Sequence, residues 1–288
     1  MSNFSKALDK IISKEQGASQ AQNISLGASG DHQRAFEYED RVTSRRLEAS
    51  HGIKKMYQPR LYTERELNSL RFVLADEKAV EQRAALEELR NQIADGNAAV
   101  GKTVLITSPV ESPAVSVFSR NLASILTTDE SVTAIIIDMV NTKESLQLTD
   151  SLKQPGVRDF VQDDSLSVKD VIYPTGIQRM RVIPTGSGLA QMGELLRTTR
   201  MRVLLKDVTR RYRERYTLII APPINSVSDV ELLNEYADQI ILAVPYSKTM
   251  KRDVIRAMGK LEKSKFLGAV MLDEIEKFKT PLDRLGLG

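Results

Sequence analysis

The chain has 288 residues, two histidines, no cysteine and a net charge of +3, and its hydrophobic and charged fractions of 41% and 27% are typical of a globular protein. These values exclude disulfides and thiolate metal sites and do not indicate a specific nucleic-acid partner, and we expect no metal site because both histidines lie in the polar N-terminal part. No apolar run approaches the roughly 20 residues that span a bilayer and the N-terminus lacks a signal-peptide core, so we expect a cytoplasmic protein.

We predict that residues 1–97 form a helical and linker-like arm. Apolar side chains at helical spacing predict a short amphipathic helix over about residues 5–15. Residues 17–30 are mostly Gly, Ser, Ala, Gln and Asn, which is typical of a flexible linker. A helical pattern returns later and continues to Ile93, just before the turn-forming stretch ADGN.

From residue 98 to 288 we predict a single α/β domain. Short apolar runs rich in Ile, Val and Leu alternate there with helical segments, as expected for strands that are buried on both faces. The expected strands are TVLITSP, TAIIIDMV, MRVIPTG, YTLIIAPP, QIILAVP and FLGAVMLD. Their alternation with helices predicts a doubly wound, mostly parallel sheet, whose binding site lies at the carboxyl ends of the strands. Those ends are Thr107–Pro109, Asp138, Pro184–Gly186 and Ala221–Pro223.

The triplet Gly101-Lys102-Thr103 looks like the end of a phosphate-binding loop, but it precedes the strand that begins at Val104. A phosphate loop requires the strand first, then a glycine-rich turn, then a helix whose N-terminus faces the phosphate. We therefore interpret the triplet as a turn, and we expect any phosphate loop to follow Thr107.

Several stretches at these strand ends, in order and with the family's spacing, resemble the cytoplasmic domain of bacterial tyrosine kinases, the autokinases of capsule and exopolysaccharide synthesis. The stretches are ITSP, NLA at 121–123, IIID ending at Asp138, GVRDFV at 156–161, IPTG at 183–186, ELLRTTRMRVLL at 194–205, APPINSVSDV at 221–230 and ADQIILAVPYSKT at 237–249. The resemblance covers the chain from Val104 to about Thr249. It implies the P-loop NTPase-like fold that this family shares with the partition and division-site ATPases.

The loop that carries the family's phosphate chemistry is degenerate. Where the family has a loop such as TSPTPGEGKSTVAANLA, this chain has TSPVESPAVSVFSRNLA over residues 107–123. Ser112 and Ala114 stand at the two glycines, and Val115 stands at the lysine that contacts the phosphates. Pro113 has no backbone N–H to donate to a phosphate. Ser116 keeps the hydroxyl position that holds Mg²⁺ in the family.

The other motifs are also incomplete. Asp138 keeps the first aspartate of the second motif, whereas Val140 stands at its second aspartate. The third motif of the family has an aspartate just before TPP, but here Ile219, Ile220 and Ala221 precede Pro222 and Pro223, so that carboxylate is missing. The C-terminal tyrosine cluster is absent. We therefore expect neither ATP nor Mg²⁺ to bind and no catalytic residue to remain, with Ser116 and Asp138 as vestiges of the cofactor-binding site.

A run of basic residues lies between the third and fourth expected strands. Its members are Arg197, Arg200, Arg202, Lys206, Arg210, Arg211, Arg213 and Arg215. They form either the solvated face of an amphipathic helix or a docking surface for an acidic partner, anionic lipid or DNA. As candidate partner-binding residues we single out Arg197, Arg200 and Arg211, together with Arg90 in LEELRNQI, where the family's oligomerisation pattern survives weakly.

Three functions are compatible with these observations. The first is a non-catalytic, pseudokinase-like component of exopolysaccharide or capsule biosynthesis that binds a membrane co-polymerase or a kinase partner, with homo-oligomerisation as a further possibility. The second is a divergent active tyrosine autokinase or ATPase of polysaccharide export. The third is a partition-type protein that binds the nucleoid or a membrane surface. The missing lysine, aspartates and tyrosines favour the first function, which implies a cytoplasmic protein held peripherally at the inner membrane.

Overall fold

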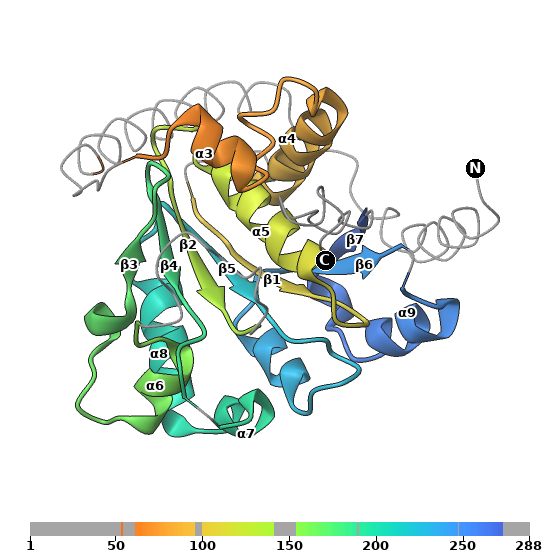
Figure 1. Cartoon of the computed structure of the whole chain (residues 1–288). Helices are drawn as coiled ribbons and strands as arrows, with labels where there is room; N and C mark the ends of the chain where they lie inside the picture. Colours follow the sequence, from red (N-terminus) through yellow and green to blue (C-terminus); the bar gives the residue numbers. More distant parts are fainter. Residues whose placement is uncertain are drawn as a thin grey trace, which may run out of the picture. The chain divides into compact units, whose positions relative to one another are not determined.

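Seven strands form one sheet in the computed structural model, in the order β3-β4-β2-β5-β1-β6-β7 (Figure 1). The strands are β1 (Thr103–Thr107), β2 (Thr133–Asp138), β3 (Tyr173–Pro174), β4 (Met180–Ile183), β5 (Arg215–Ile220), β6 (Gln239–Pro245) and β7 (Phe266–Leu272). The structure describes residues 53, 61–95, 100–140, 154–188, 190–246 and 248–272. All of these residues fall in a unit that runs from Arg46 to Gly288.

Every neighbouring pair of strands is parallel except β3 and β4. The predicted doubly wound, mostly parallel α/β fold is therefore confirmed, and each of the six expected strands is present. Strand β3 was not expected from the sequence. It has only two residues, which is too short for an apolar pattern to reveal.

Helices and 3₁₀ turns precede β1 and connect the strands. They are α3 (Glu64–Ser69), α4 (Val80–Ala94), α5 (Pro113–Leu126), α6 (Val157–Gln162), η1 (Val168–Val171), α7 (Met192–Leu196), α8 (Thr199–Arg210), η2 (Val230–Glu235), α9 (Lys251–Met258) and η3 (Lys263–Lys265). The chain passes from β1 through β2 to β4 in one direction across the sheet, and from β4 through β5 and β6 to β7 in the other. Because such crossovers are right-handed, α5 covers one face of the sheet, while α8 and α9 cover the opposite face.

Helix α5 lies between the sheet and the helices that precede it in the chain. Its apolar residues, such as Leu122, share a core with Val104 and Ile106 of β1. Its polar residues are used on the other side, where Asn121 accepts a hydrogen bond from the backbone N–H of Val73 at 2.8 Å. Covered in this way on opposite sides, α5 is buried over most of its length.

The helices expected after the predicted linker are present as α3 and α4, and they pack on α5. Phe72, Leu86 and Ile93 are buried in the same core as Leu122. The helical part of the predicted arm is therefore packed against the α/β domain, and the division between residues 97 and 98 stays a prediction. The expected helix at residues 5–15 and the expected linker at 17–30 lie outside the described residues.

Candidate functional site

The candidate site lies at the carboxyl ends of β1, β2 and β5, where three loops are joined by hydrogen bonds. The Thr107 hydroxyl donates to the carbonyl of Pro222 at 2.8 Å, and the N–H of Ile224 donates to the carbonyl of Ser108 at 3.0 Å. The N–H of Met139 donates to the carbonyl of Ile220 at 2.9 Å. The polar groups that end these strands are therefore used to hold the loops to one another.

The triplet that resembles a phosphate motif lies at the other edge of the sheet. The N–H of Gly101 donates to the carbonyl of Arg213 at 2.7 Å, next to the amino end of β5. Lys102 immediately precedes β1 and its ammonium group faces Asp95 at 3.9 Å. The triplet therefore leads into β1, and Thr103 is already the first residue of that strand, one residue earlier than expected.

The N-terminus of α5 is capped by the chain itself. Ser112 is the N-cap, and its hydroxyl oxygen accepts a hydrogen bond from the N–H of Ala114 at 3.3 Å. The N–H of Val115 donates to the carbonyl of Ser112 at 3.2 Å. Pro113, the first residue of the helix, has no N–H. At this helix start the N–H groups of Ala114 and Val115 are thus already bound to Ser112, and Pro113 has no N–H to offer an anion.

The two side chains that follow face inward. Val115 is 2% exposed and belongs to the core shared by α5 and the sheet. Ser116 is fully buried, and its hydroxyl has no hydrogen-bond partner among the described residues. A valine in the core supplies no charge to a phosphate, and these residues do not fit the triphosphate and Mg²⁺ of an NTPase.

Asp138 ends β2 and is 2% exposed. Its Oδ1 accepts a hydrogen bond from the N–H of Val140 at 2.9 Å, and the carbonyl of Val140 accepts one from the Thr185 hydroxyl at 3.1 Å. The carboxylate thus turns the chain after β2 and helps to join the ends of β2 and β4. Ser116 lies in α5, which follows β1, and Asp138 is the last residue of β2. Strand β5 lies between β1 and β2 in the sheet. Their role as vestigial cofactor ligands stays a prediction.

No group of three or more His, Asp or Glu side chains is placed to hold a metal ion within the part of the chain that the structure describes. In that part there is also no helix long and apolar enough to cross a membrane.

Several of the basic residues around α7 and α8 contact groups within the chain, whereas Arg202, Lys206 and Arg210 are exposed. Arg197 forms two hydrogen bonds with the carboxylate of Asp229, both at 2.7 Å, which lower the pKa of Asp229 and raise that of Arg197. Arg211 pairs with Asp207 one turn earlier in the helix. In α4, Arg90 donates to the Thr128 hydroxyl at 3.0 Å. These contacts leave the predicted role of the arginines in partner binding untested.

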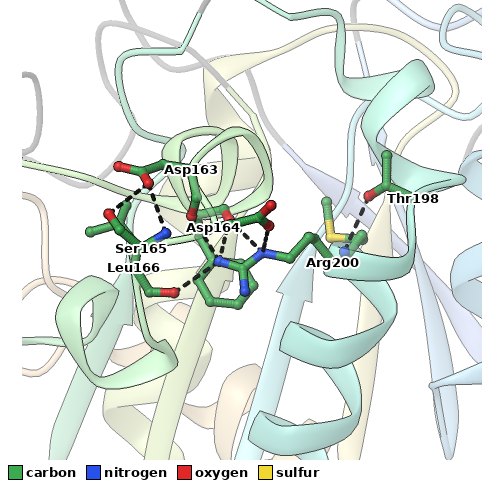
Figure 2. A network of polar contacts seen from close by, with 8 residues as sticks. Asp163, Asp164, Ser165, Leu166, Thr198 and Arg200 are labelled. Atoms are coloured by element: carbon green, nitrogen blue, oxygen red, sulfur yellow. Dashed lines mark hydrogen bonds and ion pairs between the residues drawn. The ribbon is translucent and has the colours of Figure 1, made fainter.

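Arg200 joins α8 to α6 and the turn that follows it (Figure 2). Its guanidinium donates to the carbonyls of Phe160, Asp163 and Leu166 at 2.8–2.9 Å through one nitrogen. It also lies 4.0 Å from the centroid of the Phe160 ring and 3.3 Å from the carboxylate of Asp164. Arg200 therefore acts as a cross-link within the fold, which the basic run in the sequence did not suggest.

Asp159 is a second structural residue that the sequence analysis did not single out. Its carboxylate accepts hydrogen bonds from the N–H of Gly156 at 2.8 Å and from the N–H and hydroxyl of Ser187 at 3.0 and 2.9 Å. Gly186, between β4 and Ser187, has a φ of +84°, and a Cβ there would lie 1.9 Å from Asp159 Oδ2. The stretches GVRDFV and IPTG thus fit each other, and Asp159 positions the loop after β4.

A groove of about 590 Å³ runs along α4, α5 and β7. Its lining includes Leu86 and Leu89 of α4, Val117 and Phe118 of α5 and Met271 of β7. The surface is mostly apolar, and Arg90 does not line it.

Comparison with known proteins agrees with this architecture. The chain matches no known protein-family model. It is 24% identical over 185 residues to the putative tyrosine-protein kinase CapB of Staphylococcus aureus, which covers 64% of this chain and 77% of CapB. It is 25% identical over 162 residues to the tyrosine-protein kinase ptk of Acinetobacter johnsonii, but this match spans only 22% of that relative.

Among solved structures, the kinase domain of the Escherichia coli tyrosine kinase ETK superimposes with a TM-score of 0.61 at 18% identity, over 79% of this chain and 86% of the ETK domain. The fold is therefore the P-loop NTPase-like α/β fold. The expected resemblance of the chain to bacterial tyrosine kinases is confirmed in both sequence and fold.

Proposed function

We propose that this chain is a non-catalytic, pseudokinase-like component of exopolysaccharide or capsule biosynthesis, which acts by binding a membrane co-polymerase or a kinase partner. The observation that carries the proposal is the start of α5. Ser112 caps the helix, Pro113 removes a donor, and Val115 is buried where the family has the lysine that contacts the phosphates.

The expected loss in nucleotide affinity is large enough to support a non-catalytic function. A charge-assisted hydrogen bond contributes roughly 1.5–3 kcal/mol. Loss of the lysine and of one or two backbone donors therefore removes about 4–6 kcal/mol, or roughly a 10³- to 10⁴-fold loss in affinity. Phosphoryl transfer depends on positioning and charge neutralisation, so it requires the groups that are missing here.

The parts that do not touch a nucleotide are retained. The sheet, its crossovers and the packed helices α4 and α5 persist, so the chain still presents the outer surfaces of such a domain. The relatives are named tyrosine-protein kinases, and the association of their family with polysaccharide export suggests a membrane assembly protein as the partner. The proposed location is the inner face of the cytoplasmic membrane.

The groove along α4 is the proposed contact for an apolar segment of that partner. It offers a mostly apolar lining, and Met271 at its edge is 40% exposed. Met271→Asp should therefore reduce polymer output in a strain that depends on this gene. Val80→Asp is the matched control, because Val80 is a 66% exposed apolar residue of α4 outside the groove lining. Equal output from both variants would remove the groove from the proposal.

The central test measures nucleotide binding. Calorimetry with ATP and Mg²⁺ should show no binding at micromolar concentrations, with an active tyrosine-kinase domain as the positive control. In cells, the double substitution Ser116→Ala and Asp138→Asn should leave polymer output intact, since Asn keeps the oxygen that accepts from Val140. Micromolar ATP affinity, or a folded double variant without function, would instead support the divergent-enzyme hypothesis.

A further inference from the structure

The segment around α9 exposes an unusual concentration of apolar side chains. Tyr246, Met250 and Ile255 are 59%, 59% and 53% exposed. Among large hydrophobic residues of the described part of the chain, only Val80 is more exposed. Single exposed apolar residues are common on soluble proteins, whereas three within ten residues are a local concentration of the kind found at interaction sites.

Exposed cations lie on α9 beside Ile255. Helix α9 buries Val254 and Ala257 against the domain. Its outer face carries Lys251, Arg252 and Arg256, all exposed, with Ile255 among them. Residues one turn apart lie side by side on a helix, so Ile255 is flanked by positive charge.

The one carboxylate of α9 does not neutralise that face. Asp253 is half-buried, and its Oδ2 accepts a hydrogen bond from the N–H of Met250 at 3.1 Å, which caps the helix. The Arg252 side chain is 79% exposed, and its Nε lies 3.9 Å from the Asp253 carboxylate, which is beyond hydrogen-bond distance.

Helix α9 connects β6 to the edge strand β7 and is held in place at both ends (Figure 1, lower right). The side-chain amide of Asn225 donates to the carbonyl of Asp253 at 2.8 Å, and the ammonium group of Lys260 donates to the carbonyl of Ile224 at 2.7 Å. The outer face of α9 is thus presented by a fixed element and requires no ordering before it contacts a partner.

We infer that the outer face of α9 docks directly on an anionic lipid bilayer, with Met250 and Ile255 among the headgroups and Lys251, Arg252 and Arg256 against lipid phosphates. Apolar side chains surrounded by Lys and Arg suit the membrane interface, because the apolar groups are removed from water there and the cations are attracted to anionic lipids. The core of a protein–protein interface is instead depleted in lysine, and a site for nucleic-acid phosphates has no need of exposed Met and Ile.

The lipid contact of α9 rests on the membrane association in the proposed function and makes that association a direct one. Lipid binding is measured on the purified chain without a nucleotide or a protein partner. Failure to bind lipid would therefore not contradict the proposed non-catalytic function, and ATP binding would not contradict the lipid contact.

The experiment is co-sedimentation of the full chain with vesicles of phosphatidylcholine alone and with vesicles of equal parts phosphatidylcholine and phosphatidylglycerol. The chain should bind the anionic vesicles and not the neutral ones. Each cation near an anionic surface contributes roughly a fivefold increase in affinity, so the variant Lys251→Glu, Arg252→Glu, Arg256→Glu should bind at least about 100-fold more weakly.

A variant of α8 with the same charge change is the matched control. Arg202→Glu, Lys206→Glu, Arg210→Glu also reverses three exposed cations, and it should keep binding within about threefold if α9 makes the contact. An equal loss in both variants, or no binding by the wild-type chain, would overturn the assignment.

The apolar part of the patch is tested by Met250→Ser, Ile255→Ser, which keeps the net charge. We expect this variant to bind anionic vesicles at least about tenfold more weakly, because two side chains no longer enter the interface. Unchanged binding would show attraction by charge alone and would favour an acidic protein as the partner. Unchanged circular dichroism of each variant confirms that the fold is intact.

Discussion

Helices α8 and α9 both carry several cations, yet the two regions use them differently. Of the cations beside and within α8, Arg197 and Arg200 are bound to groups of the same chain, whereas Arg202, Lys206 and Arg210 are exposed. On α9, Lys251 and Arg256 remain on the surface around Ile255. A basic run in the sequence therefore does not by itself identify a docking surface, because the neighbouring elements determine which cations are exposed to a partner.

The difference follows from what lies next to each helix. Arg200 faces the end of α6 and the turn after it, where the carbonyls of Phe160, Asp163 and Leu166 need donors. Such carbonyls attract a guanidinium, which can donate several hydrogen bonds in one plane. Helix α9 is instead fastened through its backbone and its capping aspartate, so the cations of its outer face are not required by the fold.

The largest effect is expected at Arg200. Arg200→Ala should lower the free energy of unfolding by about 3 kcal/mol, because three carbonyls lose a charged donor and the Phe160 ring loses its cation. Arg200→Lys should recover only about 1 kcal/mol of this, since an ammonium group cannot reproduce the planar contacts. Urea unfolding gives these values. The exposed Arg202→Ala is the control, and a loss as large as that of Arg200→Ala would contradict the cross-link.

A smaller effect is expected at Arg211. Its pair with Asp207 spans one turn of α8 and is partly exposed. Arg211→Ala should lower stability by about 0.5 kcal/mol at low ionic strength, and the difference should shrink in high salt. Urea unfolding at two salt concentrations checks this, and a loss that salt does not reduce would show that Arg211 stabilises by packing.

The pair of Arg197 and Asp229 predicts a change in titration. Hydrogen bonding to Arg197 lowers the pKa of Asp229 below its ordinary value of 3.8. A carboxyl with a lowered pKa contributes stability above that ordinary value and loses it as the pH falls through the folded-state pKa. Arg197→Ala should therefore raise the pKa of Asp229 towards 3.8, as measured by NMR titration. An unchanged titration would show that the pair is not formed in solution.

The smallest effect on stability is expected on α9. Neutralising Lys251, Arg252 and Arg256 together with glutamine should change the free energy of unfolding by less than about 0.5 kcal/mol, because these side chains are exposed and unused by the fold. Thermal and urea unfolding would test this. A large destabilisation would show that the fold requires these cations, as it requires Arg200, and that α9 does not differ from α8 in this respect.

Particular residues show how far prediction from the sequence reached. The apolar run that contains Ile135 and Ile136 predicted β2, because a strand buried on both faces has no polar alternation to obscure it. The resemblance to the kinase loop implied that Val115 stands at the lysine and Ser112 at a glycine. The capping of Ala114 by Ser112 was not predictable, since a serine before a helix can equally remain free or bind a ligand.

The sequence by itself determined the α/β class, the six expected strands and which residue types occupy the loop after β1, because these are local properties of apolar runs and of single positions. Only the tertiary structure decided which polar groups are occupied. Arg200 meets Phe160 forty residues earlier in the chain, and Asp159 meets Ser187 twenty-eight residues later. Such pairs depend on how the crossovers bring distant loops to one end of the sheet, and no local pattern encodes that arrangement.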